Sequence, residues 1–262
     1  MIILFQVILL IAFVVGFITI GITWNRKRSN FIAFLKPDTD SIFSDYHFLH
    51  ISKNGGTSIR SMGKGKYGIS SHDYTIDDLD SNIFFAVIRD PIDRFISSFN
   101  FAKRGGFEPN NPNFVNHPIH KYQSLNQFLD DLKNGNPVAH KALWTLESGN
   151  PADSASVIYW PQVHWLRSGK SKNLLLFDFE NLNNEFKKKF GIQLPDFNTT
   201  KKKTDTNISP ENIEFLRKLY APDFKLQEYV KEVGTMETDT YFIKTLGLPS
   251  ELITPKKFLW DV

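Results

Sequence analysis

The stretch "FLHISKNGGTSIR", Phe48 to Arg60, decides the fold. It begins as an apolar run typical of a buried strand and continues with a lysine, two glycines and two hydroxyl residues. Glycines let the backbone approach an anion closely, and the N-terminus of a following helix offers unpaired N–H groups and partial positive charge. This order therefore predicts an α/β fold with an anion site at the turn.

The position of the lysine in this turn limits the chemistry. Lys53 comes before Gly55 and Gly56, whereas the Walker pattern places a lysine after its last glycine, followed by a magnesium-binding hydroxyl. The sequence therefore argues against ordinary ATP hydrolysis. A purely structural turn would also use two glycines, and that alternative stays open.

The chain has three short apolar runs: "YHFLHIS" at Tyr46–Ser52, "IFFAVIR" at Ile83–Arg89 and "NLLLFDF" at Asn173–Phe179. Nearly continuous runs of this kind are typical of parallel strands covered on both faces. Helix start signals lie between and after them, at Ser124 and Ser209. We expect one P-loop-like α/β domain over residues 46–262, with a central parallel sheet flanked by helices.

A second candidate site follows the second run, in "VIRDPIDRFISSFNF". Asp90 and Pro91 suit a helix start, and helical spacing then separates an apolar stripe from a face carrying Arg94, Ser97 and Ser98. Arg89 lies at the carboxyl end of its strand, where open parallel sheets bind ligands. A structural salt bridge is one reading of Arg89; a second phosphate clamp beside Lys53 is the other.

Composition sets outer limits on function. The chain has 262 residues, a formal net charge of +3 and no cysteine. This length suits one large domain, and the mild positive charge suits an anionic ligand without reaching a nucleic-acid-binding signature. The lack of cysteine excludes disulfides, thiolate zinc sites and cysteine nucleophiles.

Residues 1–24 contain no charged side chain and are long enough to span a bilayer. We predict an uncleaved transmembrane anchor, followed by a juxtamembrane connector at residues 25–45. Arg26, Lys27 and Arg28 directly follow the apolar stretch, so the positive-inside rule predicts a single-pass membrane protein with a cytoplasmic domain. A degraded signal peptide is an alternative for the stretch itself. A luminal domain, in the Golgi if the source is eukaryotic, is the alternative for the orientation.

"HISKNGGTSI" followed by "FFAVIRDPIDRFISSF" resembles the two nucleotide motifs of sulfotransferases that use 3′-phosphoadenosine 5′-phosphosulfate (PAPS). The likeness is to the membrane-anchored carbohydrate group, which includes heparan sulfate 2-O-sulfotransferase. It continues through "YWPQVHWL" and "LLLFDFENLNNEFKKKFGIQLPDFN", and so covers about Phe48 to Tyr229. The resemblance implies that PAPS is the co-substrate and that a glycan or another hydroxyl compound is the acceptor.

The resemblance also implies roles for single residues. The first turn would hold the 5′-phosphosulfate, with the residues Lys53, Asn54, Gly55, Gly56, Thr57 and Ser58. The second motif would hold the 3′-phosphate, with Arg89 and Ser97. The first motif departs from the family, which has Pro at the position of Ser52 and Thr at that of Asn54. Lys201, in a lysine run, is expected to cover the nucleotide or to meet an acidic acceptor; a solvated loop is the alternative.

Sulfuryl transfer needs two reactants held in line and charge stabilised on the leaving phosphate. Lys53 suits the second task, and cationic side chains make a metal unnecessary. For the base we choose His72 in "GISSHDY", because related carbohydrate sulfotransferases place one in a similar segment. The alternative is a loop histidine paired with Asp73.

Other polar residues have structural interpretations. Glu180 and Asn181 suit either the edge of the site or a helix cap, and we leave them out of the catalytic set. His117 and His120 have no third metal ligand at a useful spacing and are expected to be loop histidines. Core packing is the expected role of the tryptophans at positions 144, 160 and 165.

Two other functions remain open from the sequence. A membrane-anchored, metal-dependent glycosyltransferase would use an Asp-x-Asp site, and such pairs occur at Asp38–Asp40 and Asp78–Asp80. A non-catalytic nucleotide-binding adaptor would keep the fold without the reaction. We expect no nucleic-acid partner and make no prediction of the oligomeric state.

Overall fold

The computed structural model describes residues 46–61, 68–69, 76, 83–106, 117–144, 158–166, 172–195, 207–233 and 235–239. The predicted anchor and connector (residues 1–45) lie outside these ranges, as do His72, Lys201 and both Asp-x-Asp pairs. Among the described residues no helix combines the length and the apolar character needed to cross a bilayer.

The centre of the fold is a five-stranded sheet in the order β2-β1-β3-β4-β5. Its strands are β1 (His47–Phe48), β2 (Gly68–Ile69), β3 (Ile83–Ile88), β4 (Asn173–Asp178) and β5 (Met236–Asp239). Strands β2, β1, β3 and β4 pair in parallel, which confirms the predicted central parallel sheet. Strand β5 pairs antiparallel with β4 and was not predicted, because "METD" has no apolar alternation.

The first strand is shorter than we expected. The predicted run was Tyr46–Ser52, but the chain leaves the ladder after Leu49, whose N–H donates to Phe85 O over 2.8 Å. Ile51 N already donates to Leu49 O over 3.0 Å, which turns the backbone. Leu49 and Ile51 stay buried after the ladder ends, so apolar sequence alone overestimated the strand.

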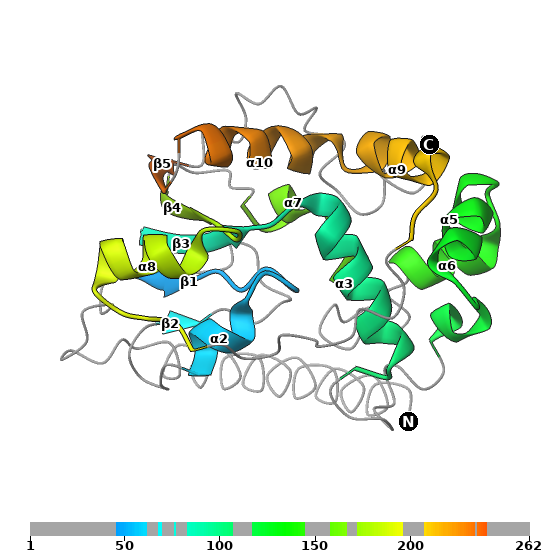
Figure 1. The fold of residues 1–262 in the computed structure, drawn as a ribbon, viewed down its shortest axis with the longest axis horizontal. Helices are drawn as coiled ribbons and strands as arrows, with labels where there is room; N and C mark the ends of the chain where they lie inside the picture. Colours follow the sequence, from blue (N-terminus) through cyan, green and yellow to red (C-terminus); the bar gives the residue numbers. More distant parts are fainter. Residues whose placement is uncertain are drawn as a thin grey trace, which may run out of the picture.

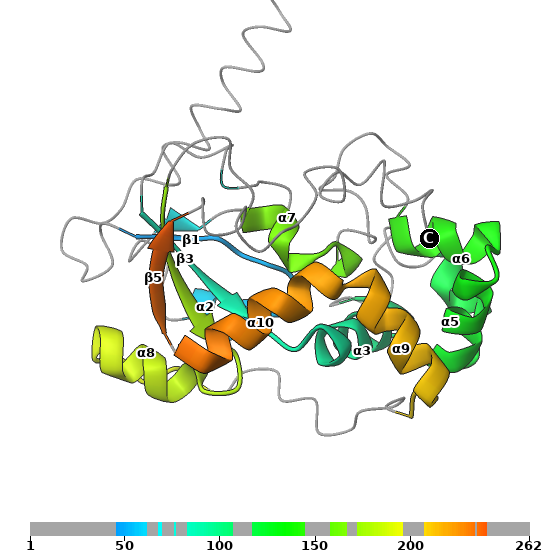
Figure 2. The ribbon, with the colours of Figure 1, turned by 90° about the horizontal axis from the view of Figure 1, so that it is seen from above.

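Helices cover both faces of the sheet (Figure 1). They are α2 (Gly56–Ser61), α3 (Pro91–Lys103), the 3-10 helix η2 (Pro118–Lys121), α5 (Leu125–Lys133), α6 (Pro137–Trp144), α7 (Gln162–Leu166), α8 (Leu182–Phe190), α9 (Pro210–Leu219) and α10 (Ala221–Val233). Figure 2 shows α10 running across the sheet, and α5 and α6 lie away from it, beyond α3. The buried residues form two clusters, a large one on the α10 side and a smaller one on the α2 and α8 side.

Polar caps start three of these helices at the positions that the sequence indicates. Ser124 Oγ accepts from Gln127 N over 3.1 Å at the start of α5, and Ser209 Oγ accepts from Asn212 N over 3.2 Å at the start of α9. At the start of α3, Asp90 Oδ1 accepts from Asp93 N over 2.8 Å. These caps confirm the predicted helix starts, because each satisfies a donor that the helix itself leaves unpaired.

Candidate anion-binding site

Lys53 occupies the turn between β1 and α2. Its backbone has a φ of 68°, in the left-handed region that residues with a side chain seldom adopt. Its ammonium lies 3.9 Å from the centroid of the Phe101 ring on α3. The turn therefore directs the lysine across the carboxyl edge of the sheet toward the helix that follows β3.

The two glycines after Lys53 are needed for close packing. A Cβ at Gly56 would lie 1.8 Å from Nε2 of His50, a buried side chain that stacks on Phe48. Gly55 has a φ of 79°, and a Cβ there would lie 3.2 Å from Cδ2 of Leu182. The turn therefore packs closely against buried side chains, and a larger residue at position 55 or 56 would displace its backbone.

Arg89 brings the second predicted motif to the first. Its Nη1 donates to Lys53 O over 2.9 Å, and its guanidinium carbon lies 4.4 Å from the centroid of the Phe179 ring. Its buried Nε has no hydrogen-bond partner among the described residues. The two turns therefore meet, and one arginine N–H remains available to an acceptor such as a phosphate oxygen.

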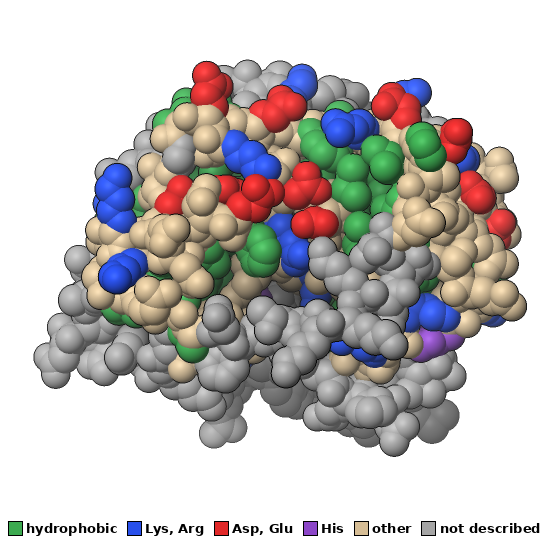
Figure 3. All heavy atoms as spheres, in the orientation of Figure 1, with side chains coloured by type: hydrophobic (Ala, Val, Ile, Leu, Met, Phe, Trp, Pro, Cys, Tyr) green, Lys and Arg blue, Asp and Glu red, His purple; other side chains and the backbone are tan. Residues whose placement is uncertain are grey.

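The electrostatics of these residues favour an anion. Burial, together with the positive charges of Arg104, Arg89 and Arg94, lowers the pKa of Lys53 to about 8. Figure 3 shows lysine and arginine side chains in a recess near the middle of this face, below a group of acidic side chains. A bound anion would relieve the repulsion among these cations.

Arg94 has a different role from the one its place on a polar stripe suggests. It is 2% exposed, and its guanidinium donates to the carbonyls of Ser52, Trp160 and Ile158 over 2.9, 2.7 and 3.2 Å. Ser98 also donates to Ile158 O, over 2.9 Å. The second face of α3 is therefore buried too, and Arg94 holds the backbone just before Lys53.

Ser97 is half-buried on α3, three residues after Arg94 and four before Phe101. Side chains at these spacings share one face of a helix. Since Arg94 binds Ser52 O and Phe101 contacts the Lys53 ammonium, this face looks toward the Lys53 turn. The predicted contact of Ser97 with a 3′-phosphate stays a prediction.

Gln162 is a residue that the sequence did not single out. Its Oε1 accepts from Asn54 Nδ2 over 2.6 Å and from Arg89 N over 3.0 Å, and its Nε2 donates to Arg89 O over 2.8 Å. Asn54 Nδ2 also donates to Val87 O, so the Asn54 amide points into the protein. A nucleotide contact by this amide stays a prediction. Gln162 lies in the motif "YWPQVHWL", but nothing in that motif indicates which residues the amide contacts.

Asp223 on α10 supports Gln162 from behind. Its carboxylate accepts from the backbone N–H groups of Gln162 and Val163 over 2.7 and 3.1 Å, at the start of α7. Burial raises the pKa of Asp223 to about 6, while the charge of Arg94 and these hydrogen bonds oppose that rise. Sequence reasoning missed Asp223 because its partners are some 60 residues away.

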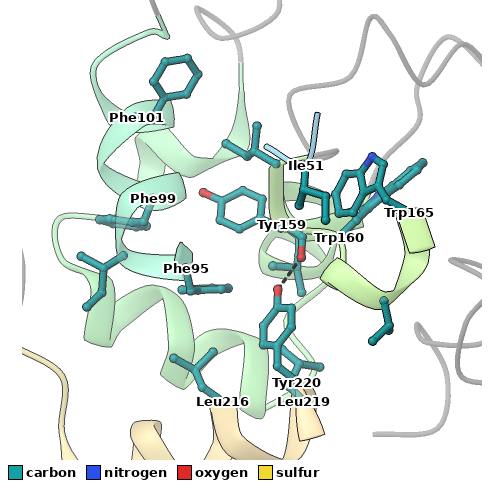
Figure 4. Packing of buried hydrophobic residues seen from close by; sticks show 14 of the residues in the cluster. Ile51, Phe95, Phe99, Phe101, Tyr159, Trp160, Trp165, Leu216, Leu219 and Tyr220 are labelled. Atoms are coloured by element: carbon teal, nitrogen blue, oxygen red, sulfur yellow. Dashed lines mark hydrogen bonds between the residues drawn. The ribbon is translucent and has the colours of Figure 1, made fainter. Parts of the chain in front are cut away.

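Aromatic side chains pack around this network. Trp160 and Trp165 are buried near Ile51 in Figure 4, which confirms the predicted core role for these two tryptophans. The Tyr220 hydroxyl donates to Tyr159 O over 2.6 Å. The core thus joins the start of α10 to the segment before α7.

Three other residues considered from the sequence make structural contacts or stand at helix ends. Glu180 pairs with Lys231 over 2.9 Å, and Asn181 is the N-cap of α8 without a side-chain cap bond. His117 Nδ1 accepts from Ile119 N over 3.2 Å at the start of η2, a local structural contact.

Comparison with known proteins gives one broad match. The model of a family described as the sulfotransferase family matches residues 64–230, more than half of the chain. The match includes Arg89, Ser97, Gln162 and Asp223, and it begins after the Lys53 turn. An uncharacterized protein of Mycoplasma pneumoniae is 27% identical over 169 residues, which are 60% of this chain and 13% of that protein. No solved structure matches.

Proposed function

Because the chain belongs to the sulfotransferase family, we propose that it moves the sulfuryl group of PAPS to a hydroxyl group of a glycan. Sulfuryl transfer in general follows from the family. PAPS as donor, the carbohydrate acceptor and the residue roles are the proposal. The likeness to the membrane-anchored carbohydrate group belongs to it too, since the family match is to sulfotransferases in general.

The observation that carries the proposal is the meeting of the Lys53 turn with Arg89. A nucleotide with phosphate groups at both its 3′ and 5′ positions needs two cationic clamps at a fixed separation. The hydrogen bond from Arg89 Nη1 to Lys53 O joins the two clamps. The unpaired Arg89 Nε and the close packing at Gly56 also fit a tightly held polyanion.

In the proposed reaction the acceptor oxygen bonds to sulfur while the bond between sulfur and the 5′-phosphate oxygen breaks. Lys53 stabilises the charge that develops on the leaving phosphate. The hydroxyl proton passes to His72, a role that rests on the sequence resemblance alone. The glycines at positions 55 and 56, with Thr57 and Ser58, hold the 5′ end, and Arg89 and Ser97 hold the 3′-phosphate. Lys201 covers the nucleotide.

A thermal-shift series tests the donor. We expect 3′,5′-ADP to raise Tm well above the shift given by ATP or AMP, since a ligand at 100 times its Kd adds about 2.7 kcal/mol of stability. Equal shifts from all three nucleotides would remove the main support for PAPS.

A matched pair of arginine variants sharpens this test. Arg89→Met should bring the shift from 3′,5′-ADP down to that from AMP, because the variant lacks the proposed 3′-phosphate clamp. Arg217→Met is the control, because Arg217 also lies over an aromatic ring, 5.2 Å from the Phe224 centroid, but on the exposed face of α9. It should leave the preference for 3′,5′-ADP intact.

Transfer of labelled sulfate from PAPS to cell-envelope glycans tests the reaction itself. Lys53→Ala and His72→Ala should abolish transfer while the fold survives. Full activity of His72→Ala would require another base. Nucleotide binding without transfer to any hydroxyl acceptor would instead favour the adaptor alternative.

The proposal includes an anchor at residues 1–24 and a cytoplasmic domain. The location of a C-terminal tag in sealed membrane vesicles tests the orientation. A tag protected from protease in vesicles that enclose the cytoplasmic side agrees with the proposal, and a tag cleaved there contradicts it.

A further inference from the structure

We propose that Gln162 is a positioning residue that holds the two anion-binding turns in register, and that Asp223 fixes Gln162 by capping α7. The inference deepens the proposed function and rests on it, since the turns matter as the two halves of one nucleotide site.

The first step is the pattern of hydrogen bonds at the Gln162 amide. One side chain satisfies both backbone groups of Arg89 and binds Asn54 in the other turn, over 2.6 to 3.0 Å. Gln162 is fully buried, so it acts through these neighbours and not on a ligand. Its three contacts join segments that are 73 and 108 residues away along the chain.

The second step concerns the end of β3. The strand ladder stops there with Phe179 N donating to Ile88 O over 2.8 Å, so the next residue, Arg89, lies just beyond it. Beyond that point the Gln162 side chain, and not a neighbouring strand, forms the hydrogen bonds to the backbone N–H and C=O of Arg89. A change in the Arg89 backbone would move the guanidinium that reaches Lys53 O, because side-chain direction follows the backbone.

The third step is the support of Gln162 itself. Helix α7 has five residues, too few to hold its own position, and its first N–H groups donate to the buried carboxylate of Asp223. The charge of Asp223 acts on Arg94, whose guanidinium holds Ser52 O. Helix α10 is thereby connected to both sides of the Lys53 turn.

The test compares two buried amides with similar hydrogen bonding. Gln162→Met keeps the length of the side chain and removes its polar atoms. The control, Asn212→Leu, removes a fully buried amide on α9 that donates to Asn126 and Asp130 and accepts from Lys133. Both variants should lower Tm, since each leaves buried polar groups without partners.

Only Gln162→Met should change nucleotide binding. We expect its Kd for 3′,5′-ADP and its KM for PAPS to rise about tenfold, the effect of losing one or two ordinary hydrogen bonds, with a smaller change in kcat. Asp223→Asn should move both constants in the same direction. An unchanged Kd in Gln162→Met, with a lower Tm, would overturn the inference and leave only a structural role.

Hydrogen exchange gives a readout that needs no ligand. In Gln162→Met the Arg89 amide, which donates to Gln162 in the wild type, and the amides of residues 53–58 should exchange faster than in Asn212→Leu. Equal exchange in the two variants would refute the positioning role. Failure of the wild type to bind 3′,5′-ADP would refute the proposed function instead, and the exchange result would still decide the role of Gln162.

Discussion

Lys53 combines two unfavourable features in one residue. Its backbone lies in the left-handed region, and its ammonium is buried beside three arginines. Both lower the stability of the free protein, and proteins tend to keep such strain where it serves binding. A single anion would offset the electrostatic part of this destabilisation.

The depressed pKa of Lys53 predicts how binding depends on pH. Protonated Lys53 attracts the nucleotide, so the Kd for 3′,5′-ADP should rise as pH increases above about 8, by up to about tenfold per pH unit. Lys53→Met should flatten this profile and weaken binding. Titration by calorimetry from pH 6.5 to 9.5 measures it, and an equally steep profile in the variant would contradict the assignment.

The same shift predicts a gain in stability from removing the charge. The unfolded lysine has the higher pKa, 10.5 against about 8, so the unfolded state binds more protons between these values and stability rises with pH in that window. At pH 7, Lys53→Met should therefore stabilise the free protein, on the order of 1–2 kcal/mol. Urea unfolding checks this, with the exposed Lys187→Met as the control.

Gly56 predicts a steric effect at the same turn. Gly56→Ala places a methyl group against the buried His50 ring and should destabilise the protein by about 1–3 kcal/mol. Removing the ring in the double variant with His50→Ala should make the alanine tolerable. Arg60→Ala, on an exposed position of α2, should change stability little. Equal effects of Gly56→Ala with and without the His50 ring would reject the steric cause.

At the scale of elements, α3 does more than follow Arg89 in the chain. Through Arg94 it holds the chain before Lys53 and the segment before α7, and its negative counterpart is Asp223 on α10. Three segments distant in sequence therefore depend on one buried charge.

Arg94→Met should destabilise the protein by about 3–5 kcal/mol, because it leaves Asp223 buried without its positive neighbour and removes the hydrogen bonds that Arg94 donates to three carbonyls. In a double-mutant cycle, adding Asp223→Asn should destabilise the protein less in the Arg94→Met background than in the wild type. Urea unfolding of the four proteins measures the coupling. Strict additivity would mean that the two charges do not stabilise each other.

At the scale of the whole molecule, the two apolar clusters differ in how closely they pack against the anion site. The smaller cluster includes Ile59 of α2 and Leu182 of α8, and Leu182 is the side chain that packs below Gly55. The larger cluster extends away from the sheet to α5 and α9. The smaller cluster therefore supports the anion turn directly.

Two phenylalanine variants separate these roles. Phe186→Leu in the smaller cluster and Phe128→Leu in the larger one should each lower stability by about 1 kcal/mol. Only Phe186→Leu should also raise the Kd for 3′,5′-ADP, because it loosens the support below Gly55. Isothermal titration of both variants measures this, and a larger effect from Phe128→Leu would contradict the division.

Local signals in the sequence were enough for several elements. Continuous apolar runs predicted β3 and β4, and Ser124, Asp90 and Ser209 marked helix starts that the structure contains. These predictions succeed because strand burial and helix capping depend on residues close together in the chain. The order of the lysine and glycines likewise pointed to an anion site.

Contacts between distant segments could not be predicted in this way. The sequence determined β3, β4, the caps and the two cationic turns, because each depends on neighbouring residues. Only the tertiary structure decided that β5 adds an antiparallel edge, that Arg94 is buried, and that Gln162 and Asp223 support both turns. The physical reason is that a buried amide or carboxylate acquires its role from partners that folding brings within about 3 Å, and one sequence records no such distance.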